Sequence, residues 1–240
     1  MAVVLGAALG VVAVVAAVTG LRAWPLWRAL RAVRPATPER LVAAARDGRY
    51  DGRLVALAGV AAPGPEGTLS SVVNELPCVW HRYTVHRRRI HYRATATGVS
   101  QRGSVARRVA DVASTEPFRV GGVEVRPAGM RVHRPLACAT RILPALASEP
   151  FPDALMAQPP YLFRHREWVL RPGTALFVLA QVRSAGPRIT LRRPDRGPHV
   201  ISTRTVGWLR ASSAVSAVGG FAVAALAGVA GAVILIAHYL

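Results

Sequence analysis

Two long apolar stretches lie near the ends of the chain, and every Arg, Asp and Glu lies between them. Residues 2–21 contain no charged side chain, and after Arg210 the only ionisable side chains are His238 and Tyr239. A helix of about 20 apolar residues is long enough to cross the hydrocarbon core of a bilayer. The pattern therefore predicts two transmembrane helices, at residues 2–21 and 211–238.

The first stretch also fits the apolar part of a cleaved signal peptide. A signal peptide begins with a positively charged region, whereas only the terminal amine precedes the apolar run here. Both stretches are rich in Gly and Ala, which permit close approach between helices in a membrane. We therefore expect a true span at each end, with a signal peptide as the alternative for the first.

Residues 22–52 are expected to form an interfacial segment followed by a short helix. Thr37, Pro38 and Glu39 supply an N-cap, a proline at the first helical position and an acidic side chain in the first turn. Gly48 is expected to end this helix after roughly ten residues.

Residues 53–209 consist of short apolar or alternating runs separated by Gly and Pro, a pattern typical of strands and turns. The fold class predicted is an all-β domain of short, mostly antiparallel strands, preceded by a short helix and flanked by two transmembrane α-helices. The segment from Arg141 to Phe163 holds five prolines and is expected to be a surface excursion with at most one short helix. The expected strands are 54–60, 78–85, 90–96, 118–120, 123–125, 168–170, 175–182, 188–191 and 200–201.

The distribution of charge predicts how the chain is oriented across the membrane. There are 31 basic and 12 acidic side chains, a net charge of +19, and all of the basic side chains are Arg. Because arginines flank both spans on the inner side, the positive-inside rule predicts a cytoplasmic central domain with both termini outside. Trp24, Trp27 and Trp208 fit an interfacial aromatic belt. The flanking arginines are Arg22, Arg28, Arg31, Arg34, Arg40, Arg192, Arg193, Arg196, Arg204 and Arg210.

The same charge favours anionic partners. An anionic membrane leaflet is one such partner, whereas nucleic acid is disfavoured because no helix-turn-helix, zinc-finger or RNP-like pattern accompanies the charge. Arg87, Arg88 and Arg89 fall between two expected strands, in what reads as a hairpin connection. We expect these three side chains to contact anionic lipid or a protein partner, or else to form a solvated turn.

Catalytic and metal-binding signals are weak. The sequence has no GxSxG, GxGxxG, P-loop or HExxH motif. His81, His86 and His91 recur every five residues, which is better explained by solvated strand positions than by a metal cluster. Cys78 is expected to be a small buried side chain. We predict no catalytic residue, no cofactor and no metal ligand, and take the nearby His165 and Glu167 as a structural salt link rather than an acid/base pair.

Several segments in a fixed order resemble a known family. These segments, taken together, are similar to the GIDE domain, also called the BAM domain, of the mitochondrial membrane E3 ubiquitin ligases of the MULAN type. The resemblance covers about residues 53–209 and the flanking spans. The segments are Val60 with its Pro/Gly turn, 78–82, 116–118, 167–173, 176–180 and 201–204.

The resemblance implies a domain held between two membrane helices, followed in the family by a RING finger. A RING finger needs about eight Cys or His ligands around two zinc ions, whereas this sequence has only Cys78 and Cys138. An Asp that commonly precedes the turn glycine in the family is replaced here by Val120 before Gly121 and Gly122. We therefore expect a membrane-anchored binding or scaffold module at the cytoplasmic membrane face, with an unidentified protein partner. The alternative is E3 ubiquitin-transferase-like activity that depends on a separate partner, as family membership would imply.

Overall fold

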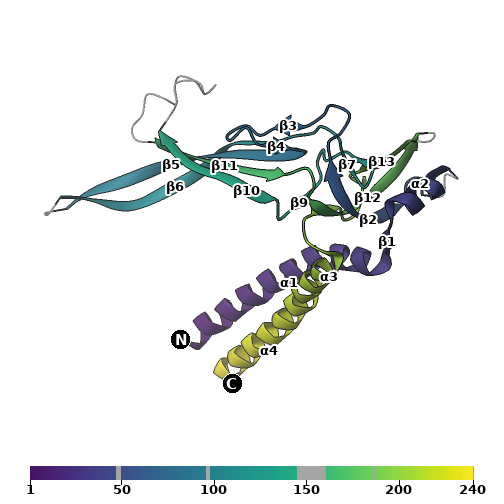
Figure 1. Ribbon diagram of the computed structural model, residues 1–240. Helices are drawn as coiled ribbons and strands as arrows, with labels where there is room; N and C mark the ends of the chain where they lie inside the picture. The colour runs from purple at the N-terminus through teal and green to yellow at the C-terminus, as the bar shows by residue number, and fades with distance from the viewer. Residues whose placement is uncertain (47–49, 96–97, 145–160, 186–187, 240) are drawn as a thin grey trace. The chain divides into compact units, whose positions relative to one another are not determined.

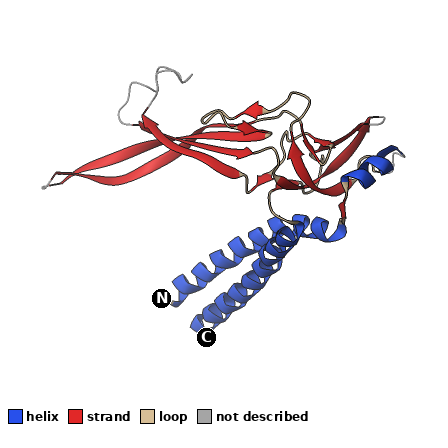
Figure 2. Cartoon of the chain, viewed as in Figure 1, coloured by secondary structure: helices blue, strands red, loops and turns tan. Residues whose placement is uncertain are grey.

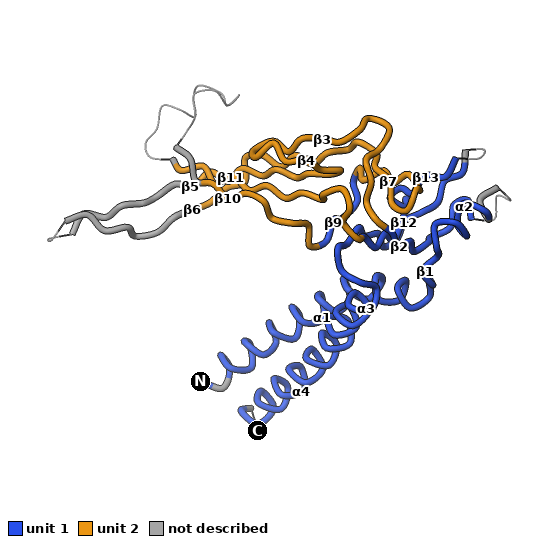
Figure 3. Tube along the Cα trace, viewed as in Figure 1, with its two compact units in different colours: residues 1–59, 129–133, 176–240 blue, residues 60–128, 134–175 orange. Residues whose placement is uncertain are grey.

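The protein consists of two long apolar helices and a strand-rich central region, as the sequence predicts (Figure 1, Figure 2). The structure is a computed structural model that describes residues 1–46, 50–95, 98–144, 161–185 and 188–239. The chain divides into two compact units (Figure 3). Unit 1 comprises residues 1–59, 129–133 and 176–240, and unit 2 comprises residues 60–128 and 134–175.

The two long helices belong to unit 1. Helix α1 spans Ala2–Ala32, and the second long helix comprises α3 (Val206–Ala214), a π-helical turn η2 (Val215–Gly219) and α4 (Gly220–Tyr239). Both are long and apolar enough to cross a membrane. The spans predicted at 2–21 and 211–238 lie within them. Exposed apolar side chains along both helices provide the surface that lipid would cover, including Val4 and Leu226, each more than 70 % exposed.

Small residues let these two helices approach closely. The helices run antiparallel, so the N- and C-termini lie at the same end of the pair (Figure 1). A Cβ atom added to Gly220 would lie 2.8 Å from the Ala16 carbonyl oxygen and 2.8 Å from the Gly20 amide nitrogen. Backbone contact of this kind is the usual reason for glycine between membrane helices. Gly220 therefore fixes where the two helices cross.

Short strands and a second helix complete unit 1. Strand β1 pairs in parallel with β2, β12 pairs antiparallel with β13 and β14, and β14 pairs in parallel with β9. The elements are β1 (Pro35–Ala36), α2 (Pro38–Arg46), β2 (Leu54–Ala62), β9 (Val132–His133), β12 (Ala175–Ala185), β13 (Arg188–Arg192) and β14 (Val200–Ser202). The last three residues of β2 and the first residue of β12 belong to unit 2.

The ends of the apolar helices are anchored in the core of unit 1. Leu30 of α1 and Leu209 of α3 are buried in one cluster with Phe177 and other apolar side chains of the strands. Arg210 Nε donates a hydrogen bond to the Leu30 carbonyl at 2.8 Å. The last carbonyls of a helix have no partner within that helix, so Arg210 satisfies an acceptor that α1 leaves open. The two helices are thus fixed to each other at the end where the strands begin.

The short helix α2 begins as the sequence predicts. The Arg40 amide donates to Thr37 Oγ1 at 3.5 Å, and the Leu41 amide donates to the Thr37 carbonyl at 3.0 Å. Thr37 therefore acts as the N-cap, with Pro38 at the first helical position. The expected stop at Gly48 lies outside the described residues.

Unit 2 is built on a four-stranded antiparallel sheet in the order β10–β11–β5–β6. Two small hairpins, β3–β4 and β7–β8, accompany it. The strands are β3 (Leu69–Ser70), β4 (Pro77–Cys78), β5 (Trp80–Thr95), β6 (Gly98–Ala113), β7 (Phe118–Val120), β8 (Val123–Val125), β10 (Leu136–Pro144) and β11 (Tyr161–Leu170).

The hairpin β7–β8 was predicted correctly. Gly121 and Gly122 form its two-residue turn, with positive φ values of 57° and 86°. Two-residue hairpin turns of this conformation favour glycine because other residues rarely adopt positive φ.

Two expectations about unit 2 were wrong. Residues 80–95, which include most of the strands expected at 78–85 and 90–96, form one continuous strand, β5, so no hairpin connection lies between them. Cys78 belongs to β4 instead. Pairing to β11 on one side and β6 on the other holds this strand extended through its polar middle. The bounds expected for the excursion at 141–163 were also wrong, because residues 141–144 belong to β10 and residues 161–163 belong to β11. The rest of that prediction, residues 145–160, lies outside the described residues.

The helix crossing can be tested with neighbouring glycines. We expect Gly220→Ala to destabilise the protein by about 1–3 kcal/mol, since the added methyl group meets backbone atoms that cannot move aside. Gly219→Ala is the matched control, because a Cβ atom there meets nothing within 4 Å. Thermal unfolding of the full chain in detergent measures both. Equal unfolding temperatures for the two variants would contradict the close crossing at Gly220.

Candidate functional site

Arginines collect on one face of the four-stranded sheet in unit 2. In the strand register His86 of β5 lies opposite Arg164 of β11, and Arg88 of β5 lies opposite Ala106 of β6. Paired residues share a face, and so do residues two apart on a strand. We call this surface the basic face and define it by Arg82, His86, Arg88, Arg108, Arg164 and Arg166, with Ala106 and Asp111 among them.

The basic face is hollowed at its centre. His86, Arg88, Ala106, Arg164 and Arg166 line a cavity of about 280 Å³. A planar guanidinium group presents its N–H donors in a fork that matches a carboxylate or a phosphate. The cavity can therefore accept an anionic group and offer it several donors at once.

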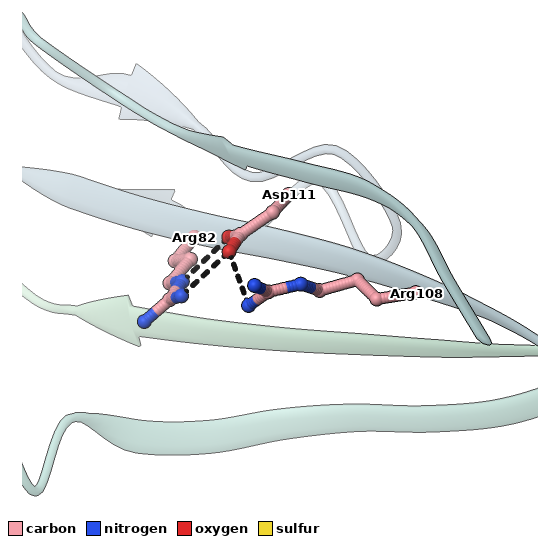
Figure 4. A network of polar contacts seen from close by, with 3 residues as sticks. All are labelled: Arg82, Arg108 and Asp111. Atoms are coloured by element: carbon pink, nitrogen blue, oxygen red, sulfur yellow. Dashed lines mark hydrogen bonds and ion pairs between the residues drawn. The ribbon is translucent and has the colours of Figure 1, made fainter. Parts of the chain in front are cut away.

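One acidic side chain lies on the basic face, and two arginines hold it (Figure 4). Arg82 donates to both oxygens of Asp111, at 2.8 and 2.7 Å, and Arg108 donates to Asp111 Oδ2 at 2.7 Å. The hydrogen bonds from Arg82 lower the pKa of Asp111, and the charges of Arg82, Arg108 and His86 lower it further. Asp111 therefore stays ionised at neutral pH.

The remaining arginines of the basic face keep their charge available. Arg88, Arg164 and Arg166 form no ion pair within the part of the chain that the structure describes. All three side chains are partly exposed, so a ligand can reach them. The excess positive charge on this face thus lies around the cavity rather than around Asp111.

Arg87, Arg88 and Arg89, which were expected to contact lipid or a protein together, do not all lie on one face. All three residues lie within β5, where successive side chains point to opposite faces of the sheet. Arg88 lies on the basic face and Arg87 on the other face. The side chain of Arg89 lies outside those that the structure describes. A role for these residues in binding lipid or protein stays a proposal.

The same alternation separates the histidines. His86 lies on the basic face, whereas His81 lies on the opposite one. The side chain of His91 lies outside the described ones. Among the described residues no three Cys, His, Asp or Glu side chains lie close enough to hold a metal ion.

Glu167 is a buried carboxylate on the other face of β11. Its side chain is fully buried and accepts hydrogen bonds from Ser71 Oγ at 3.1 Å and from the Val73 amide at 3.0 Å. Cys138 Sγ lies 3.4 Å from Glu167 Oε2. His165 lies on the same face but hydrogen-bonds to the Tyr83 hydroxyl. Glu167 therefore joins the segment between β3 and β4 to the sheet, and the link to His165 stays a prediction.

Neither thiol is poised for nucleophilic chemistry. Burial, together with the charge of Glu167, raises the pKa of Cys78 to about 11. Burial and the hydrogen bond to Glu167 raise the pKa of Cys138 to about 11. Both cysteines are free, and at neutral pH both stay protonated, whereas the reactive form of cysteine is the thiolate. Cys78 is buried, as the sequence predicts.

Most residues of the basic face were not predicted from the sequence. Arg164 and Arg166 come from β11, and Arg108 comes from β6, and none of them was singled out. The alternation Phe163-Arg164-His165-Arg166-Glu167 is a period-two signal that could have placed both β11 arginines on one face. Only the pairing of β11 with β5 brings them next to Arg88, and no local pattern encodes that pairing.

The role of Glu167 can be tested by truncation. We expect Glu167→Ala to destabilise the protein by about 3 kcal/mol, because the Ser71 hydroxyl and the Val73 amide would lose their acceptor in a buried site. Glu66→Ala, at an exposed carboxylate, should change the unfolding free energy by less than about 0.5 kcal/mol. Chemical denaturation of the full chain in detergent compares them, and equal losses of stability would contradict a structural role for Glu167.

Comparison with known proteins identifies the family. Residues 88–235 match the model of the GIDE family, which is described as an E3 ubiquitin ligase. No curated protein and no solved structure gives a match. The matched segment begins in the middle of β5, includes the strands that carry most of the basic face, and ends within α4. The chain therefore belongs to the GIDE family of membrane E3 ubiquitin ligase relatives.

Proposed function

We propose that this protein is a membrane-anchored binding module that holds a protein partner at the cytoplasmic membrane face. The basic face of unit 2 receives an acidic segment of that partner. The observation that carries this proposal is the cavity between Arg88, Arg164 and Arg166, three cations without an acidic partner among the described residues.

The chemistry of the basic face favours a carboxylate-rich protein segment. Arginines on neighbouring strands can each donate two hydrogen bonds to a carboxylate in a fixed plane. An exposed ion pair contributes little by itself, so affinity depends on several pairs forming together. A surface with this excess of positive charge also speeds the encounter with an acidic partner.

The proposed orientation follows from the arginines beside each apolar helix. All ten lie on the inner side of the two predicted spans, which favours a cytoplasmic central domain under the positive-inside rule. An antiparallel pair of spans puts both termini on the same side of a membrane, and the arrangement of α1 and α4 is of that kind (Figure 1). We therefore place the spans at 2–21 and 211–238 and both termini outside.

Binding to the basic face can be tested with a fluorescent poly-glutamate peptide. The full chain is reconstituted in nanodiscs of neutral phosphatidylcholine, and affinity is measured by fluorescence anisotropy at increasing salt. The combined variant Arg88→Ser, Arg164→Ser and Arg166→Ser should weaken binding about 10-fold at low salt, because each exposed pair contributes roughly 0.5 kcal/mol.

A control of equal charge makes this test specific. Arg107→Ser, Arg119→Ser and Arg171→Ser remove three exposed cations from unit 2 outside the basic face and should leave most of the affinity intact. Equal losses in both triple variants would contradict the proposal. A second result would also contradict it: the wild-type chain binds phosphatidylglycerol more strongly than it binds the peptide, and the basic-face variant loses that lipid binding to the same extent. Lipid would then be the ligand of the basic face.

The orientation predicts which tags are accessible from outside. An epitope fused after Leu240 should be labelled by antibody in intact cells. An epitope inserted in the exposed turn between Gly121 and Gly122 should be labelled only after the membrane is permeabilised. Labelling of the turn epitope in intact cells would overturn the cytoplasmic placement of the central domain.

Family membership favours a second candidate function, a part in protein ubiquitination. With two cysteines in the chain, both with raised pKa, we expect this activity to need a separate catalytic partner. The purified chain, incubated with ubiquitin, an activating enzyme and a panel of conjugating enzymes, should form no more conjugates than the same mixture without it. Conjugates that form only when the chain is added, without a further partner protein, would favour the ligase function over the binding module.

A further inference from the structure

Unit 1 contains a second and larger cavity. It lies beside the C-terminal part of α1, which packs in the core of unit 1. The cavity measures about 790 Å³ and is lined by residues from α1, α3, η2 and the segments around β9 and β14. It is independent of the basic face, which lies in unit 2. Its lining combines arginine and histidine side chains with small and apolar residues of the helices.

The polar part of this cavity is cationic. Arg22 from α1 and Arg131 from the segment before β9 line it, together with His133 and His199. None of its lining residues is Asp or Glu. Both arginines are exposed, so their guanidinium groups can turn toward a ligand. The cavity is therefore complementary to an anion.

The two histidines add hydrogen-bonding capacity. His133 is held by Ser202 Oγ, which lies 3.4 Å from its Nδ1, and by the Trp208 ring, whose centroid lies 5.5 Å away. His199 Nδ1 is buried and has no hydrogen-bond partner among the described residues. An unsatisfied buried nitrogen is costly. His199 also lines the cavity, so its imidazole ring adds a polar group to the wall.

The helices contribute apolar side chains to the cavity. Pro25 and Leu26 of α1 and Trp208 and Leu209 of α3 line it. Ser212 and Ser216 also line it, and each donates its hydroxyl to a carbonyl of its own helix, at 3.2 and 3.0 Å. Their hydroxyls are thereby satisfied, and their small size leaves room between the helices. This part of the cavity suits a hydrocarbon chain.

We propose that this cavity binds one anionic phospholipid of the membrane that the helices span. Arg22, Arg131 and His199 would hold the phosphate group, and an acyl chain would lie along the small and apolar residues of α1, α3 and η2. A membrane lipid is favoured over a soluble phosphate because the cavity walls are formed by helices long and apolar enough to cross a bilayer. Cation-rich pockets beside membrane helices bind anionic headgroups by the same chemistry.

The proposal is tested by the lipid that the full chain retains. Nanodiscs containing phosphatidylcholine with a small fraction of phosphatidylglycerol are used, and lipid bound to the released protein is counted by native mass spectrometry. We expect one phosphatidylglycerol per chain, preferred over phosphatidylcholine. Arg22→Ser with Arg131→Ser should weaken its retention about 30-fold, because each arginine beside an anionic headgroup contributes about 1 kcal/mol.

Two further variants separate the cavity from the general surface charge. Arg28→Ser with Arg34→Ser removes two exposed arginines of unit 1 that do not line the cavity, and retention should be unchanged. Ser216→Phe keeps every charge but fills the helical part, and retention should fall. Each variant's unfolding temperature confirms that it is folded.

Three results would overturn the lipid site. The first is an equal loss of phosphatidylglycerol from the Arg28 and Arg34 variant and from the Arg22 and Arg131 variant. The second is equal retention of phosphatidylcholine and phosphatidylglycerol by the wild-type chain. The third is displacement of the lipid by inorganic phosphate at matching concentration, which would make the cavity a site for soluble phosphate instead.

Discussion

Pairing of β5 on both of its edges is the constraint on which the basic face depends. Because β11 and β6 bind this strand on either side, its backbone stays extended through a run of charged residues that would otherwise favour a turn. Alternation then divides consecutive arginines between two faces. Arg88 joins Arg164 and Arg166 around a cavity, while Arg87 lies on the opposite face. Without this pairing, the arginines of β5 would only be neighbours in the sequence, and they would not form a cavity with the arginines of β11.

A second constraint organises unit 1. The close approach of Gly20 and Gly220 fixes the crossing of the apolar helices, and Arg210 ties the end of α1 to α3 through the Leu30 carbonyl. Leu30 and Leu209 then place both helix ends in the core of the strands. The cationic cavity lies beside this junction, where long apolar helices meet polar strand segments. A ligand with both an apolar and a charged part suits this boundary between apolar helices and polar strand segments.

Local patterns in the sequence were enough to predict elements whose cause is local. The absence of charge identified both long helices, Thr37 and Pro38 identified the start of α2, and Gly121 with Gly122 identified the β7–β8 hairpin. The long strands of unit 2 were harder, because β6 and the middle of β5 are rich in Arg, Ser and Gly and lack the apolar alternation of a half-buried strand. Their stability comes from partners distant in the sequence. For the same reason Arg88 was singled out from the sequence, but the arginines that surround it were not.

The most direct test of the account compares two adjacent positions on β6. Ala106 lies in the cavity of the basic face, whereas its exposed neighbour Val105 lies on the opposite face of the same strand. A photo-cross-linking amino acid is placed at either position in the full chain, and adducts formed in the native membrane are identified by mass spectrometry. The account predicts a covalent adduct from position 106 with a protein segment rich in Asp and Glu, lost at high salt, and no such adduct from position 105. Adducts with the same proteins from both positions, or none from position 106, would contradict it.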